Sequence, residues 1–150
     1  MPTPTSRSRR GFGRCLAGRR GLIPPGTRPD YAAHVRAVRS SFPEVVAALR
    51  EILGLKLCAY LGSVKETRAV NEWAEGVREP SDAVQRRLRL ALQVAGAIAE
   101  VDGPEVARAW FQGLNPQLDD RSPARLLREG DIDEVGPEVI AAERAFLVGG

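Results

Sequence analysis

The sequence predicts a small all-α protein, a fold class supported by its composition and by the spacing of its apolar residues. Apolar residues make up 43% of the 150 residues and aromatic residues only 5%, so Leu, Val and Ala must fill most of the core. Such a composition favours helices over sheets. The alternating runs of Val, Ile, Thr and Tyr that form strands are absent from the sequence. From Tyr31 onward, apolar residues instead recur every three or four positions, as on one face of a helix.

The signals of two helices lie between residues 41 and 62. Residues 41–44, Ser-Phe-Pro-Glu, have the spacing of a capping box, in which a Ser and a Glu three residues later cap the start of a helix. We expect this helix to end at Gly54. A short helix over residues 55–61 follows, and Gly62 ends it.

The next helix is expected to begin between Ser63 and Thr67. Either a second capping box at residues 63–66 or Thr67 itself caps its start, and Gly76 is placed to end it. The apolar positions between residues 84 and 99 then share one face, which predicts the longest amphipathic helix of the chain.

The remaining helices are short until the last one. A third capping-box pattern at residues 102–105 predicts a helix, and Asn115-Pro116 breaks it because proline disfavours helix at the preceding residue. Ser122-Pro123 opens another short helix, which Gly130 stops. Gly136-Pro137 is expected to open the last helix.

Charge is distributed unevenly along the chain. Residues 1–29 hold seven arginines and no acidic residue, whereas residues 90–150 hold five basic and eleven acidic residues. The basic N-terminal part is expected to attract an acidic partner, and the acidic C-terminal part a basic one. Because residues 1–30 contain few sizeable apolar side chains and many Pro, Gly and Ser, we expect a disordered, arginine-rich tail there. Such a tail either contacts phosphates non-specifically or is merely solvated.

The few cysteine and histidine residues limit the chemistry. Cys15 and Cys58 have no pairing or metal-ligand spacing, which favours a reducing, cytoplasmic location. His34 is the only histidine, and the sequence has no nucleophile-base pair, metal-ligand cluster or glycine-rich phosphate loop. We therefore expect neither an enzyme nor a cofactor or metal site. No apolar run is long enough to span a membrane, and no apolar stretch of an export signal follows Arg9-Arg10.

Residues 57–80 have the spacing of a helix-turn-helix unit, in which a support helix and a tight turn position a second helix against DNA. Gly62 makes the turn, and Val70 and Trp73 anchor the second helix in the core. Four polar side chains are left outside, and we expect them to bind DNA: Lys65, Thr67, Arg68 and Asn71.

The residue types suit such contacts. Arg and Asn pair with the edges of guanine and adenine, whereas Lys and Thr suit phosphates. Neighbouring arginines are expected to hold the DNA backbone, namely Arg78, Arg86, Arg87 and Arg89. The alternative is a solvated helix face, because Glu66, Glu72 and Glu75 repel phosphate.

Two patterns resemble a known family. The spacing of Val70, Trp73, Gly76 and Pro80 resembles the end of the Xre-type helix-turn-helix. A later pattern resembles the toxin-binding domain of the Xre/MbcA/ParS-like antitoxin family, whose members show a Trp, an Asn-Pro or similar pair, and Pro-x-x-Leu-Leu-x-x-Gly before a last helix. The corresponding residues are Trp110, Asn115, Pro116, Pro123, Leu126, Leu127 and Gly130. Together the resemblances cover roughly residues 45–147.

The resemblance implies a helix-turn-helix domain at residues 31–100 and a toxin-binding domain at residues 101–150. It further implies a cytoplasmic bacterial antitoxin of a type II toxin-antitoxin pair. Its partner would be a RES-type toxin that consumes NAD, and its C-terminal region would cover the entrance of the toxin's active site. Binding of operator DNA would then autoregulate the operon. Such a protein acts without a cofactor, as a homodimer or as a hetero-oligomer with the toxin.

The charge of the back half agrees with this implied mechanism. A site that binds a dinucleotide pyrophosphate is expected to be electropositive, and an acidic surface is drawn to it. The side chains that we expect to bind the toxin are acidic or apolar: Glu129, Asp131, Ile132, Asp133, Glu134, Val139, Glu143, Phe146 and Leu147. The alternative function is a stand-alone helix-turn-helix transcriptional regulator with a dimerising back half.

Overall fold

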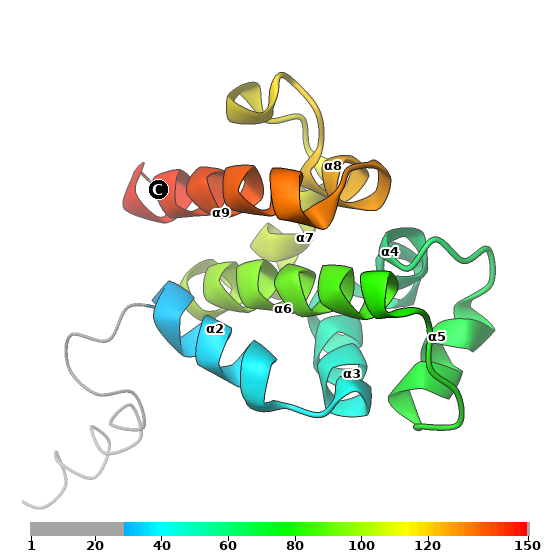
Figure 1. Cartoon of the computed structure of the whole chain (residues 1–150). Coiled ribbons are helices and arrows are strands. Elements are labelled where there is room, and N and C mark those ends of the chain that lie inside the picture. Colours follow the sequence, from blue (N-terminus) through cyan, green and yellow to red (C-terminus); the bar gives the residue numbers. More distant parts are fainter. Residues whose placement is uncertain (1–28, 150) are drawn as a thin grey trace, which may run out of the picture.

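The computed structural model describes residues 29–149, which form eight α-helices and one 3-10 helix, with no strand among them (Figure 1). The expected all-α class is confirmed. In chain order the elements are α2 (Pro29–Arg39), α3 (Phe42–Leu53), α4 (Leu55–Leu61), α5 (Thr67–Ala74), α6 (Asp82–Asp102), α7 (Pro104–Gln112), η1 (Pro116–Leu118), α8 (Pro123–Glu129) and α9 (Ile132–Gly149).

Helix α6 is the centre of the molecule. Helices α2, α3, α7 and α9 all pack on it, and Figure 1 shows it running between α9 on one side and α2 and α3 on the other. Small residues permit this close packing, since a Cβ atom at Gly96 would lie 3.6 Å from the Cβ of Ala33 in α2. The amphipathic helix expected over residues 84–99 is confirmed, but its second half is buried on nearly every side.

A single cluster of buried side chains runs through the described residues, from Ala37 in α2 to Ala142 in α9. The domain boundary that we expected between residues 100 and 101 falls inside α6, and the cluster continues across it. Of the expected arginine-rich tail at residues 1–30, residues 1–28 lie outside the described residues. Pro29 and Asp30 are the first residues of α2.

Most expected helix ends are confirmed, because their signals are local. The carboxylate of Glu44 accepts hydrogen bonds from the Ser41 amide at 3.2 Å and from the Ser41 hydroxyl at 2.7 Å, and these bonds lower the pKa of Glu44. Gly54 ends α3 with a φ of 89°. Gly76, with a φ of 74°, follows α5 in a Schellman arrangement, in which its amide and that of Val77 bond to carbonyls of the last turn.

Two expected capping boxes are wrong. Ser63 lies in the turn after α4 with a φ of 58°, and α5 begins at Thr67 with Glu66 in the cap position. Asp102 is the last residue of α6, and Gly103, with a φ of 96°, makes the turn into α7. The four-residue pattern alone does not reveal which residue leaves the helical conformation, and here the turn geometry decides it.

The last helix begins earlier than we expected, at Ile132 rather than at Gly136-Pro137. The Asp131 carboxylate accepts the Asp133 amide at 2.8 Å and so caps the helix start. Burial of Val135 holds this first turn in the core. Pro137 therefore lies inside the helix, where it lacks the amide hydrogen that a helical residue donates. The capping by Asp131 and the burial of Val135 together outweigh the preference of proline for the first turn of a helix.

Several arginines cap the C-terminal ends of other helices. Arg89 of α6 donates to the carbonyls of Ala37 and Ser40 at 2.8 Å each, at the end of α2. Three more donate to terminal carbonyls of α3 and α4: Arg108 to Ile52 at 2.8 Å, Arg87 to Leu61 at 2.9 Å and Arg128 to Tyr60 at 3.1 Å. Burial lowers the pKa of Arg87, and the charge of Arg128 lowers it further. These side chains hold helices that are distant in the sequence.

Candidate partner-binding surfaces

Helices α4 and α5 pack against each other across the turn that the sequence predicts. A Cβ atom at Gly62 would lie 2.7 Å from the ring of Trp73, so only glycine allows this approach of turn and helix. Trp73 is 2% exposed, and its ring centroid lies 6.5 Å from that of Phe42 in α3. The turn and the anchor of the expected helix-turn-helix unit are therefore in place.

The four side chains expected to bind DNA are not equally available. Lys65 and Arg68 are exposed, whereas Thr67 and Asn71 are half-buried. The Asn71 side-chain oxygen accepts a hydrogen bond from Arg50 Nη1 of α3 at 2.9 Å, so this amide is engaged inside the chain. The expected pairing of Asn71 with an adenine edge would have to break that bond.

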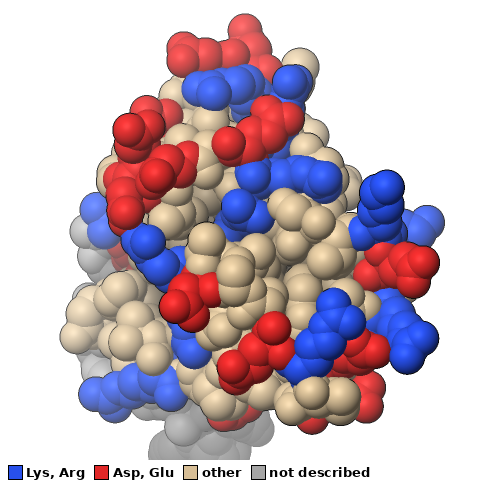
Figure 2. Space-filling model, turned by 45° about the vertical axis from the view of Figure 1, so that its right-hand side comes forward, with Lys and Arg blue, Asp and Glu red and all other residues tan. Residues whose placement is uncertain are grey.

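Acidic residues neutralise much of the basic charge around α5. The Glu72 carboxylate binds both Arg68, at 2.9 Å, and Arg78, at 3.0 Å. Arg86 pairs with Asp133, and two of the other expected phosphate contacts, Arg87 and Arg89, cap helices instead. Figure 2 shows the side of the molecule that carries α5, and basic and acidic side chains are interleaved across it.

The side chains expected to bind a toxin fall into separate groups. Five of them surround the start of α9, where the acidic ones are exposed and Ile132 is half-buried. We call this group the acidic end of α9, and it comprises Glu129, Asp131, Ile132, Asp133 and Glu134. Within it, Glu129 pairs with Arg125 at 3.1 Å. Asp133 pairs with Arg86 and Asp131 accepts the Asp133 amide, but all of these carboxylates remain exposed.

Two of the expected toxin contacts lie in the core instead. Val139 is fully buried, and Glu143 is only 2% exposed. Both project from the face of α9 that packs against the rest of the molecule, so neither contributes to an exposed surface. The rotation of α9 about its axis decides which of its residues point inward, and it places Val139 and Glu143 in the core.

The other end of α9 carries an apolar surface. Phe146 and Leu147 are half-buried, and Val148, which the sequence analysis did not single out, is 84% exposed. Phe146 is held against Trp110 of α7, with ring centroids 6.3 Å apart. We call Phe146, Leu147 and Val148 the apolar tip of α9. At roughly 1.5 Å per helical residue, it lies about 20 Å from Asp133.

The described residues offer little for catalysis. Burial raises the pKa of the Cys58 thiol to about 12, because the thiolate is disfavoured in an apolar environment. Among residues 29–149, no three His, Cys, Asp or Glu side chains are placed to hold a metal ion. None of the helices in this range has the length and apolar character needed to cross a membrane.

The fold is similar to that of a protein from a toxin-antitoxin complex. The structure matches a chain of the crystal structure of the M. tuberculosis MbcT-MbcA toxin-antitoxin complex, with a TM-score of 0.55 and 28% sequence identity. The match covers 71% of this chain and 96% of that chain. No family model matches the sequence.

The sequence is similar to the mycobacterial cidal antitoxin MbcA, both from Mycobacterium tuberculosis (strain ATCC 25618 / H37Rv) and from Mycobacterium bovis (strain ATCC BAA-935 / AF2122/97). Identity is 35% over 68 residues, which are 45% of this chain. The chain spans 60% of the length of these curated relatives. The expected similarity to MbcA-type antitoxins is confirmed, whereas the Xre type of the helix-turn-helix and the RES type of the toxin stay predictions.

Proposed function

We propose that the chain is the antitoxin of a toxin-antitoxin pair and that it neutralises its toxin by direct binding, without enzymatic activity. The similarity to MbcA carries this proposal. It is supported by the fold, since the structure matches a chain of a toxin-antitoxin complex over 96% of that chain. A binding role also agrees with the buried, unreactive Cys58 thiol.

We place the toxin contact on α9, because this helix is held rigidly and exposes both of its ends. Val139 and Ala142 are buried in the core, and Phe146 packs against Trp110. A helix fixed in this way loses little conformational entropy when a partner binds. The acidic end and the apolar tip are therefore available together on one preorganised element.

The two ends of α9 suit different parts of the binding process. Carboxylates at the acidic end attract an electropositive surface and raise the rate of association. Apolar side chains at the tip, such as Leu147 and Val148, supply the buried contacts that hold a complex together. A RES-type toxin with an NAD-binding site fits this pair of surfaces, with the tip covering the entrance of the active site.

Co-expression with the toxin candidate encoded beside this gene tests the proposal. We expect the candidate to arrest growth and the intact chain to restore it. Val148→Glu should abolish the rescue, because it places a charge in the apolar contact. Leu114→Glu is a matched control, since Leu114 is 74% exposed and lies outside α9. A harmless neighbour would disprove the antitoxin function, and rescue by Val148→Glu would disprove the placement at the tip.

The acidic end has a separate test. We expect the double variant Asp133→Asn and Glu134→Gln to slow toxin association by about tenfold at low salt while leaving a stable complex. The control is Asp119→Asn with Asp120→Asn, which removes two exposed carboxylates elsewhere. Asn tolerates the left-handed backbone of those two residues. Equal effects of the two double variants would show that only net charge matters.

A second function, binding of operator DNA, is favoured by the packing of α4 and α5 across Gly62 and by two exposed basic side chains. We propose that Lys65 and Arg68 make the main contacts, with Thr67 at the helix start and Asn71 contributing only after it leaves Arg50. Binding of operator DNA in this way would autoregulate the operon. A stand-alone transcriptional regulator would show the same DNA binding but no toxin partner.

Promoter-fragment retention measures this second function. Lys65→Ala with Arg68→Ala should abolish sequence-specific retention, while Lys56→Ala, which removes an exposed lysine from α4, should preserve it. Adding Asn71→Ala to the double variant should have little further effect. Unchanged retention in the double variant would rule out α5 as the DNA-reading helix.

A further inference from the structure

A hollow of about 500 Å³ opens beside α5, on the part of the surface proposed above to face DNA. Its lining holds three basic side chains, Lys65, Arg68 and Arg78, and two carboxylates, those of Glu66 and Glu72. Glu66 is exposed at the start of the helix, whereas the Glu72 side chain is only 20% exposed. The hollow is therefore polar, with one sheltered carboxylate among basic groups.

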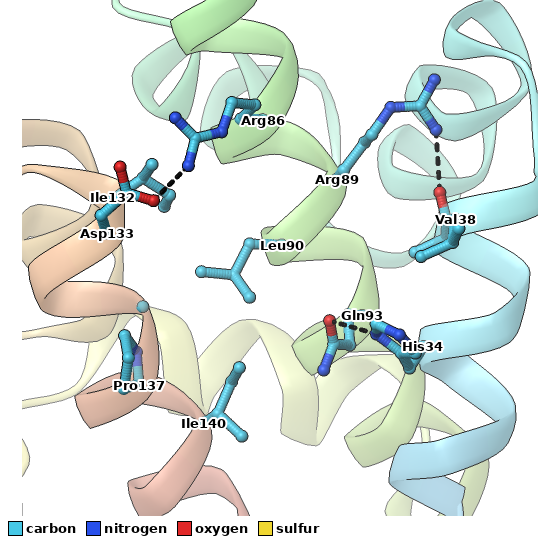
Figure 3. A pocket seen from close by; sticks show the side chains of 12 residues that line it. His34, Val38, Arg86, Arg89, Leu90, Gln93, Ile132, Asp133, Pro137 and Ile140 are labelled. Atoms are coloured by element: carbon cyan, nitrogen blue, oxygen red, sulfur yellow. Dashed lines mark hydrogen bonds and ion pairs between the residues drawn. The ribbon is translucent and has the colours of Figure 1, made fainter.

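The two oxygens of the Glu72 carboxylate bind one arginine each. Oε1 accepts a hydrogen bond from Arg68 Nε at 2.9 Å, and Oε2 accepts one from Arg78 Nη1 at 3.0 Å. The pair of Arg86 with Asp133 differs, because there one carboxylate meets one arginine (Figure 3). Charge-assisted bonds from guanidinium groups suit the oxygens of a phosphate as well as those of a carboxylate.

The turn after α5 brings Arg78 to this point. Arg68 and Glu72 are four residues apart on one helix, where an ion pair is ordinary. Arg78 comes from beyond the helix, and the chain reverses before it at Gly76, with a φ of 74°. The Val77 amide donates to the carbonyl of Glu72 at 2.9 Å. The backbone beside Arg78 is therefore tied to the residue that the Arg78 side chain binds.

We propose that Arg68 and Arg78 form a phosphate-binding site, which the carboxylate of Glu72 occupies while the chain is free of DNA. The ligand is a phosphate of the DNA backbone, so this inference rests on the proposed binding of operator DNA. The side chains of Arg68 and Arg78 are 82% and 58% exposed, so a phosphate reaches them from solvent. Exposed ion pairs stabilise a protein little, and the exchange of Glu72 for a phosphate therefore costs little.

This site sets the affinity for DNA rather than the choice of sequence. An arginine that pairs with a guanine edge discriminates between sequences. An arginine that binds a phosphate strengthens binding to every sequence alike. Glu72 limits this affinity, because a phosphate has to displace its carboxylate.

Fluorescence anisotropy of the promoter fragment and of an unrelated duplex, over a series of salt concentrations, tests the site in the full chain. We expect Arg78→Ala to weaken binding of both duplexes by about tenfold and to lower the salt slope by about one, as the loss of one phosphate contact predicts. Arg36→Ala is the matched control, since Arg36 is also an exposed arginine paired with one glutamate, Glu100, at 3.2 Å. It should change neither the affinity nor the slope.

Inorganic phosphate tests the site without DNA. Its addition should shift the NMR signal of the Arg68 Nε–H group, at about tenfold lower phosphate concentration in Glu72→Gln and not at all in Arg78→Ala. The same shifts in a chain that binds neither duplex would disprove DNA as the ligand and assign the site to free phosphate. An Arg68 signal that phosphate leaves unchanged in Glu72→Gln, where no carboxylate competes, would overturn the site itself. So would a loss in Arg78→Ala that is confined to the promoter fragment.

Discussion

The α4-α5 unit and the acidic end of α9 both pair charged side chains within the chain, but the paired carboxylates differ in how far they remain exposed. Around α5, Glu72 binds Arg68 and Arg78, and Asn71 binds Arg50, so two of the four side chains expected to bind DNA, Arg68 and Asn71, are already bound within the chain. At the acidic end of α9, Asp133 pairs with Arg86 and Glu129 with Arg125, yet these carboxylates stay 72% and 58% exposed, whereas Glu72 is only 20% exposed. The number of charges on a helix face is therefore a poor guide to the charge that a partner meets, because pairing with residues on the same helix and on other helices decides it.

The packing of the two regions differs as well. Trp73 lies fully inside the core beside Gly62, whereas Trp110 is half-buried and supports Phe146 from one side. The α4-α5 unit is thus fixed by close contacts, and α9 is fixed along one face only. We expect substitutions to reveal this contrast in stability and in binding.

The largest effect is expected for the tryptophans. Trp73→Ala should lower the free energy of unfolding by about 3–5 kcal/mol, because it leaves a cavity in the core. Trp110→Ala should cost roughly half as much, since its side chain is only half-buried. Urea denaturation measures both values, and equal losses would contradict the contrast between the two regions.

The second-largest loss in the free energy of unfolding is expected when a helix-capping arginine is removed. Arg89→Ala should lower the free energy of unfolding by about 1.5–3 kcal/mol, because two carbonyls at the end of α2 lose a charged donor. Arg86→Ala removes only a surface ion pair with Asp133 and should cost less than about 1 kcal/mol. A larger loss for Arg86→Ala than for Arg89→Ala would refute the capping role.

Glycine substitutions probe the close contacts directly. Gly62→Ala should destabilise the fold by about 1–3 kcal/mol, since the added Cβ would lie 2.7 Å from the ring of Trp73. At Gly136 the added Cβ would meet the flexible end of Leu90 at 3.2 Å. The higher helix propensity of alanine offsets that contact, so Gly136→Ala should change stability by less than about 1 kcal/mol. Thermal melting distinguishes the two variants, and similar decreases of the melting temperature in both would contradict the prediction.

The smallest effect on stability, but a clear one on DNA binding, is expected at Glu72. Glu72→Gln releases two arginines and should strengthen retention of the promoter fragment by up to about tenfold. Its stability should change by less than about 1 kcal/mol. Glu79→Gln removes the same charge from an exposed neighbour and serves as control. Equal strengthening in both variants would show that net charge, rather than the freed arginines, is responsible.

Local signals in the sequence predicted much of the fold. Ser41, Gly54 and Gly76 end or begin helices as expected, because each acts on backbone groups within a few residues of itself. The candidate surfaces were predicted less well. Val139 is apolar and Glu143 is acidic, as are their exposed neighbours on α9. Only the rotation of α9 about its axis places these two side chains in the core.

By itself, the sequence determined the all-α class, the order of the helices and the turn at Gly62, since composition, periodicity and capping are properties of short segments. It also determined which half of the chain is acidic. Tertiary structure decided which charged side chains bind groups that are distant in the sequence. Arg87 and Arg89 reach carbonyls 26 to 52 residues away, and no local pattern indicates such partners. An apolar groove between α2, α6 and α9 (Figure 3) arises in the same way, because its walls come from segments that meet only after folding.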